Sequence, residues 1–383
     1  MNAKEIGEIR RRQKRERSNM RAIYGCYVGD NKEIISSFTR RFSEMPQAEA
    51  EKYFALLRRI LGGASSDRIG KNLVDITFRT AQVADSPEHK LLMDLRGKGI
   101  EDEDTRTAFF QKVVESTSMD TAYLIVLATE TYNVPFKNKR GEEDADASDE
   151  TFSYCLCAIC PVKLTKPVLH YVHDSKDFQD GNIVNAVSFP EIGFLFPAFT
   201  DRATDIYSAL YYNRSSKDNH KGFVAAIFNT PIDKPAAEQK LAFSALVAGA
   251  LDKECSLDTI NAVQDQVRQQ ILLHKEARTS EPLKLSQNNL SKTLQGCGVS
   301  ENGVDAFNRQ FEATFGKDAE VYPENIFDPK KLEITTPDVT IRVAADRSDL
   351  VETRVIGGIK YILVKAEEGA SVNGISIQID GAK

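Results

Sequence analysis

The sequence predicts an α+β protein: an N-terminal mixed sheet with helices, then a helical region closed by a small antiparallel β unit. Strands and helices do not alternate regularly in the first part of the chain, which argues against a doubly wound parallel sheet. Helical periodicity dominates residues 235–315, and short strands with tight turns dominate 337–379. We therefore expect four segments along the chain. These are a basic N-terminal helix (1–21), an α+β domain (22–230), a helical region (231–320) and a C-terminal β unit (321–383).

The first elements follow from local signals. Residues 2–18 predict a helix with Ile6 and Ile9 on one side. The turn residues Gly29-Asp30-Asn31 predict a hairpin. Apolar residues at a spacing of three and four predict a helix from Pro46, which Gly62-Gly63 ends. The expected elements are the hairpin strands 23–27 and 33–38, the helix 46–61 and the strand 73–78.

Capping residues and apolar runs place the next elements. Ser86 and Pro87 are typical of an N-cap and a first helical position, so we expect a helix over 87–96. A helix over 103–116 follows. A polar, charged insert at 137–150 separates two long apolar strands. The remaining expectations are strands at 122–131 and 151–162, apolar runs at 183–189 and 193–199, and a helix or strand at 206–212.

The second half changes character at Asp233. Ser256, Ser286 and Ser300 are plausible N-caps, and Gly296 and Gly316 fit helix ends. Gly357-Gly358 and Asn373-Gly374 predict tight hairpin turns. We expect helices at 235–250, 256–276, 286–295 and 300–315. Residues 337–379 are expected to be all β, with strands at 339–343, 350–356, 359–364 and 375–379.

Composition restricts the class of protein. The chain has 383 residues, of which 41% are hydrophobic and 28% charged, so a packed core is expected. No apolar run approaches the ~20 residues of a membrane span, and the charged N-terminus is not a secretory signal. Six scattered cysteines do not form a disulfide framework. These observations predict a cytoplasmic protein without a membrane partner.

The first 21 residues differ in charge from the rest of the chain. They hold eight cationic and three acidic residues, whereas the whole chain has a net charge of −6. A basic segment on an acidic body favours a polyanionic partner, because it attracts phosphates that the body repels. A solvated or protein-docking helix face is the alternative. The candidate nucleic-acid contacts are Arg10, Arg11, Arg12, Lys14, Arg15 and Arg17.

Two other patterns are open to a chemical interpretation. Cys155, Cys157 and Cys160 could bind zinc with His170 and His173, but on a strand Cys155 and Cys157 share one face while Cys160 points to the other. We therefore expect buried structural cysteines. Asp75 with Glu88 and Lys90 resembles a nuclease signature, yet Glu88 and Lys90 open a helix. We assign no catalytic residue, no metal and no cofactor.

Nearly the full length resembles a bacterial family of unknown function, through stretches such as KEIGEIRRR at 4–12, GCYVGDNKEIIS at 25–36 and DSPEHKLLMDLR at 85–96. Residues 123–379 also resemble the YejK-type nucleoid-associated proteins in the order of their elements, with GFVAAIF at 222–228 and VRQQ at 267–270 within that order. The second resemblance implies a cytosolic, non-enzymatic, DNA-associated protein. It does not identify which residues of this chain would contact DNA.

We therefore expect the protein to associate non-specifically with nucleic acid, and we take double-stranded DNA of the nucleoid as the expected partner. A homodimer is compatible with this function. An adaptor whose basic helix docks an acidic protein is one alternative. The other is an enzyme, such as a metal-dependent nuclease or hydrolase, whose site assembles from scattered residues. Those residues would be Asp75, His89, His170, His173, Asp201 and Arg202.

Overall fold

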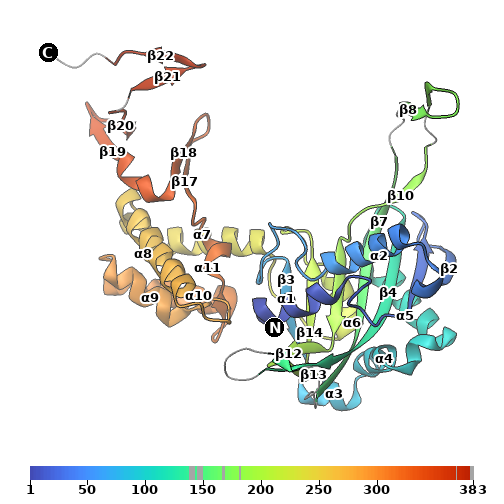
Figure 1. Ribbon diagram of the computed structural model, residues 1–383. Helices are drawn as coiled ribbons and strands as arrows, with labels where there is room; N and C mark the ends of the chain where they lie inside the picture. The colour runs from blue at the N-terminus through green and yellow to red at the C-terminus, as the bar shows by residue number, and fades with distance from the viewer. Residues whose placement is uncertain (138–142, 145–149, 166–168, 181–182, 368, 380–383) are drawn as a thin grey trace. The chain divides into compact units, whose positions relative to one another are not determined.

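The computed structural model describes residues 1–137, 143–144, 150–165, 169–180, 183–367 and 369–379 (Figure 1). The chain divides into two compact units. The first comprises Met1–Ala236 with Ser280–Pro282, and the second comprises Ala237–Thr279 with the chain from Leu283 onward.

An eight-stranded sheet forms the centre of the first unit. Its strands are β1 (Ala22–Val28), β2 (Ile34–Arg41), β3 (Leu73–Thr77), β4 (Tyr123–Val134), β7 (Glu150–Leu164), β10 (Asn185–Val187), β11 (Ile192–Phe196) and β14 (Ser208–Asn213). They lie in the order β2-β1-β4-β7-β11-β14-β3, and β10 pairs with β7 beside this path. We expected a mixed sheet, whereas every strand pair in it is antiparallel.

Helices cover both faces of this sheet (Figure 1). They are α1 (Ala3–Arg12), α2 (Gln47–Arg59), α3 (Thr80–Asp85), α4 (Pro87–Arg96), α5 (Glu103–Ser116) and α6 (Lys221–Phe228). Because side chains alternate along a strand, Leu124 and Val126 of β4 pack with α1 and α2, while Ile125 and Leu127 pack with α4, α5 and α6. The sheet is therefore buried on both sides, which explains why its central strands are nearly continuous apolar runs.

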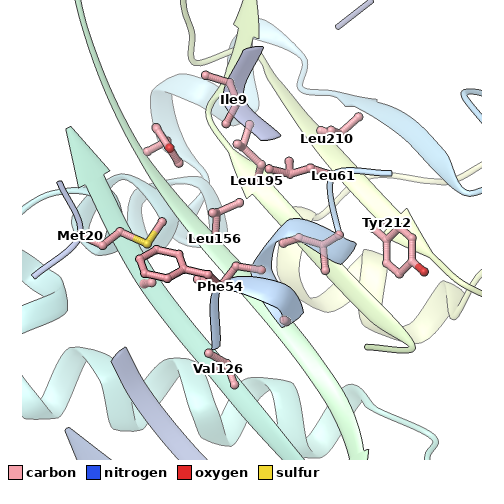
Figure 2. Packing of buried hydrophobic residues seen from close by; sticks show 14 of the residues in the cluster. Ile9, Met20, Phe54, Leu61, Val126, Leu156, Leu195, Leu210 and Tyr212 are labelled. Atoms are coloured by element: carbon pink, nitrogen blue, oxygen red, sulfur yellow. The ribbon is translucent and has the colours of Figure 1, made fainter. Parts of the chain in front are cut away.

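Figure 2 shows part of the core on the α1 and α2 side. Ile9 of α1 and Phe54 of α2 lie over Leu156 and Leu195 of the sheet, and all four side chains are at most 1% exposed. Gly193 permits this close approach of helix and sheet. A Cβ atom there would lie 2.4 Å from Ile60 Cγ2 and 2.7 Å from the Cys157 carbonyl oxygen.

Short elements connect the main ones. These are η1 (Phe42–Glu44), η2 (Lys98–Glu101), β5 (Phe136–Lys137), β6 (Glu143–Asp144), β8 (Leu169–Val172), β9 (Asp177–Asp180), β12 (Ala198–Thr200) and β13 (Ala203–Asp205). The hairpin of β12 and β13 turns at Asp201 and Arg202, whose φ angles are 52° and 59°. Positive φ at both central residues is the geometry that a two-residue hairpin turn requires.

The second unit is a helical bundle followed by hairpins. Its helices are α7 (Ala236–Leu251), η3 (Asp252–Glu254), α8 (Leu257–Glu276), α9 (Gln287–Gly296), α10 (Glu301–Phe315) and α11 (Pro323–Ile326). Phe243, Val267, Leu294, Phe307 and Phe311 form the centre of its core. The remaining elements are β15 (Leu285–Ser286), β16 (Glu320–Val321), β17 (Lys331–Thr335), β18 (Thr340–Ala344), η4 (Ala345–Leu350), β19 (Val351–Ile356), β20 (Ile359–Val364), β21 (Ala370–Val372) and β22 (Ile375–Ile377).

The α+β class is confirmed, and α4 and α5 have the predicted bounds. The predicted helix over 2–18 is wrong beyond Arg12, because Gln13 caps the helix and a turn begins at Lys14. Residues 206–212, for which either a helix or a strand was expected, lie mostly in the strand β14. Most of the insert at 137–150 lies outside the described residues.

Candidate nucleic-acid interface

The helix α1 begins with a reciprocal cap. The Asn2 side-chain oxygen accepts hydrogen bonds from the backbone N–H groups of Lys4 (3.0 Å) and Glu5 (3.1 Å), and the Glu5 carboxylate accepts one from the Asn2 N–H (2.7 Å). This capping box fixes where the helix starts. Ile6 and Ile9 then face the sheet and are at most 3% exposed. The basic cluster therefore begins in the last turn of a helix that is docked on the protein.

Arg12 points into the protein. Its Nε and Nη2 atoms donate to Glu130 Oε1 at 3.0 Å and 2.5 Å, and its guanidinium lies 4.1 Å from the centre of the Tyr132 ring. The Glu130 side chain is fully buried. A carboxylate buried this completely requires a hydrogen-bonded cation, so the role of Arg12 is to neutralise Glu130 inside the folded protein.

Gln13 and Tyr154 complete the surroundings of Glu130. The Gln13 Nε2 atom donates to the Tyr154 hydroxyl (3.0 Å), which donates to Glu130 Oε2 (2.5 Å). Burial, followed by the charge of Glu130, raises the pKa of Tyr154 well above its usual range, so this hydroxyl stays a donor. Gln13 is also the C-cap of α1, where its backbone N–H donates to the Arg10 carbonyl oxygen (3.2 Å).

The six candidate contacts divide into two groups. Arg10 donates to the Gly62 carbonyl oxygen and Arg15 donates to that of Met45 (3.0 Å). With Arg12, they are half-buried and engaged with their own protein. The other three are exposed, and among the residues that the structure describes none of their side chains makes a hydrogen bond or ion pair. These three are Arg11, Lys14 and Arg17.

Two further exposed arginines adjoin this segment. The Phe42 N–H donates to the Arg21 carbonyl oxygen (3.0 Å), and Arg41 of β2 pairs with Ala22 of β1. The backbones of Arg21 and Arg41 therefore both lie at the open end of the β1–β2 hairpin, and because neighbouring positions alternate, their side chains point to opposite faces of the sheet. We name the exposed set the basic corner: Arg11, Lys14, Arg17, Arg21 and Arg41. Sequence reasoning missed Arg41, although the predicted hairpin register could have placed it at the same end of the hairpin as Arg21.

Two acidic side chains, Glu16 and Glu44, belong to the same segments as these cations. Glu16 is exposed within the same segment, and Glu44 lies 3.4 Å from Arg41 in a pair whose side chains are about 70% exposed. A pair as exposed as this is worth little, so Arg41 can exchange Glu44 for another anion. The corner also lies on the edge strand β2, where the sheet ends.

Three of the scattered enzyme candidates contact the N-terminal segment. The Met1 amino group lies 2.9 Å from Asp75 Oδ1, the Asp201 N–H donates to Glu5 (2.8 Å), and Arg202 lies 2.9 Å from Glu8. Glu8 also accepts a hydrogen bond from the Tyr132 hydroxyl (2.9 Å). Each of these contacts holds α1 on the first unit.

The histidines lie elsewhere. His89 is buried on the opposite face of the sheet, where its Nε2 atom is 2.8 Å from the Ile206 carbonyl oxygen and its ring packs against Phe78 and Phe196. His173 is exposed at the turn of the β8–β9 hairpin, and the side chain of His170 lies outside the described residues. The structure therefore does not bring the six enzyme candidates to one site.

The cysteine prediction is confirmed. Cys155 and Cys157 belong to the core on the α4 side and Cys160 to the core on the α2 side. All three are buried free thiols, and burial raises the pKa of Cys155 to about 12. Within the described ranges, no three His, Cys, Asp or Glu side chains are grouped so that they could hold a metal ion.

Comparisons with known proteins give the context of these features. None of the helices in the described ranges has both the length and the apolar character needed to cross a membrane. No curated protein matches the chain. The model of a family described as a domain of unknown function, DUF4317, matches residues 1–375. Since this match covers nearly the whole sequence, the chain belongs to the DUF4317 family.

Proposed function

We propose that the protein binds nucleic acid non-specifically, through phosphate contacts made by the basic corner. The observation that carries the proposal is the set of five exposed cations at the end of α1, on the turn after it and at the open end of the β1–β2 hairpin, three of which make no side-chain hydrogen bond or ion pair among the described residues. Phosphate binding of this kind depends on the local density of positive charge and requires no base-specific geometry.

The contacts in the proposal differ from those expected from the sequence. Arg10, Arg12 and Arg15 are replaced by Arg21 and Arg41, because the former three already bind groups of the protein. Arg12 remains important in an indirect way. By holding α1 on Glu130, it keeps Arg11 and the following turn in place, so fewer backbone conformations have to be lost when a phosphate binds.

The resemblance of residues 123–379 to YejK-type proteins in the order of elements, inferred from the sequence, is the second argument for the proposal. It favours double-stranded DNA as the partner and the nucleoid of the cytoplasm as the location. The acidic balance of the whole chain, net −6, fits a protein that meets DNA on one restricted surface.

A salt titration with matched variants tests the proposal. The test variant replaces Arg11, Lys14 and Arg17 by Ala, and the control replaces Lys90, Lys98 and Lys221 by Ala. The control removes the same charge from exposed positions of α4, η2 and α6. Binding of a fluorescent duplex is measured by anisotropy from low to physiological salt.

We expect log K to fall with log salt for the unmodified protein, with a slope of about −0.9 for each phosphate contact. Removing three contacts makes the slope shallower by about 2.7, and the control leaves it unchanged. Absence of binding at low salt, or the same change of slope in both variants, contradicts the proposal. Retention of an acidic protein after nuclease treatment, with no duplex binding, favours the adaptor instead.

A further inference from the structure

A cavity of about 650 Å³ lies beside α2, on the α1 and α2 side of the sheet. Leu124 of β4 lines it from the buried core, and Tyr53 and Leu56 of α2 line it as partly buried side chains. Val187 and Phe189 line the opposite side, where they are 44% and 55% exposed. Its volume is within the range of about 300–1,000 Å³ that is usual for small-molecule sites.

The apolar wall at Phe189 is held in place. The guanidinium of Arg59 lies 5.8 Å from the centre of the Phe189 ring, and Arg59 also lies 3.4 Å from Asp67. The Ser188 N–H donates to the Pro161 carbonyl oxygen (2.8 Å), which fixes the backbone just before Phe189. The cavity is therefore formed by ordered parts of one unit.

The charges that line the cavity leave one cation available. Glu49 pairs with Arg40 at 2.9 Å, and Arg214 pairs with Glu191 at 2.7 Å. Lys52 is exposed on the same helix as Glu49, and no hydrogen bond or ion pair of its side chain occurs among the described residues. The site thus combines a large apolar surface with one unpaired positive charge at its rim.

We infer that this cavity binds a single-chain amphiphile with an anionic head, of which a long-chain carboxylate is the simplest. The hydrocarbon chain covers Leu56, Leu124, Val187 and Phe189 and removes their exposed apolar surface from water. The head group lies at Lys52, where a charge-assisted hydrogen bond is available. This binding site is separate from the basic corner and does not depend on nucleic-acid binding.

The absence of tryptophan from the chain provides a direct test. Phe189→Trp introduces one indole at the wall of the cavity, whose emission is followed during titration with hexadecanoate below its aggregation concentration. Equilibrium dialysis of the unmodified protein with labelled hexadecanoate gives the affinity without any substitution. Lys52→Gln is the test variant, and Lys90→Gln removes an equal charge on the opposite side of the sheet.

We expect saturable binding with a blue shift of the indole emission. Lys52→Gln should weaken the binding of hexadecanoate by about tenfold, which is the scale of one lost charge-assisted hydrogen bond. Lys90→Gln should leave the affinity unchanged. Hexadecanol binds the unmodified protein about tenfold more weakly than hexadecanoate. The inference is overturned if dialysis detects no saturable binding or if hexadecanol binds as tightly as hexadecanoate. It is also overturned if Lys52→Gln and Lys90→Gln weaken the binding of hexadecanoate equally.

Discussion

Replacing Glu130 by Leu should release α1 from the first unit. In the folded chain Glu130 accepts hydrogen bonds from Arg12, the Tyr154 hydroxyl and the Asn19 N–H (3.1 Å). The variant removes the acceptor and leaves Arg12, whose side chain is 17% exposed, without its counterion. Breaking one side of a buried ion pair costs about 3–5 kcal/mol.

Hydrogen exchange measured by mass spectrometry is the suitable assay, because it reports opening of α1 separately from unfolding of the whole chain. Each 1.4 kcal/mol changes an equilibrium tenfold, so amide exchange in residues 3–20 should accelerate by about two to three and a half orders of magnitude. The double variant Arg12→Met with Glu130→Leu should lose less protection than Glu130→Leu alone, because neither buried charge remains.

Glu16→Leu is the matched control, since it removes an exposed carboxylate from the same segment. We expect it to change the free energy of opening by less than about 0.5 kcal/mol. If Glu130→Leu exchanges no faster than this control, or if the double variant is less protected than Glu130→Leu alone, the ion pair does not hold α1 and the reasoning is refuted.

Two further predictions follow from burial. A thiol reagent such as Ellman's reagent should modify the exposed Cys255 in the folded protein and spare Cys155, Cys157 and Cys160 until denaturant is added; rapid reaction of all of them would contradict their burial. Burial raises the pKa of Tyr132 to about 12, so its contribution to stability is fully present below its unfolded value near 10 and is lost as pH rises toward 12. Phenolate absorbance and circular dichroism should therefore show unfolding together with ionisation of Tyr132, whereas full titration of every tyrosine near pH 10 without unfolding would refute it.

Sequence reasoning succeeded where the signal is local. Ser86 and Pro87 fixed the start of α4, and the period of two along a strand placed Cys160 on the opposite face from Cys155 and Cys157. These features depend on neighbours within a few residues. They could therefore be predicted before any tertiary contact was known.

Long-range contacts decided what could not be predicted. Arg12 and Arg11 are equivalent in a count of charge, and only the fold brings Glu130 to one of them. The burial of Gln13 beside the Tyr154 hydroxyl, 141 residues away in sequence, likewise depends on the fold. Short apolar runs are ambiguous as well: α6 begins after His220, whose side chain makes no capping hydrogen bond, so only the left-handed Asn229 at its end is a usual helix signal.

The position of β3 has a consequence for how the protein forms during synthesis. β3 is an edge strand whose pairing partner is β14, with Leu73 opposite Tyr212. Until the ribosome has released Tyr212, the nascent segment around Leu73 has no partner strand and exposes apolar residues. Topologies with such distant pairings fold slowly, so early intermediates of this chain should be the forms most dependent on chaperones.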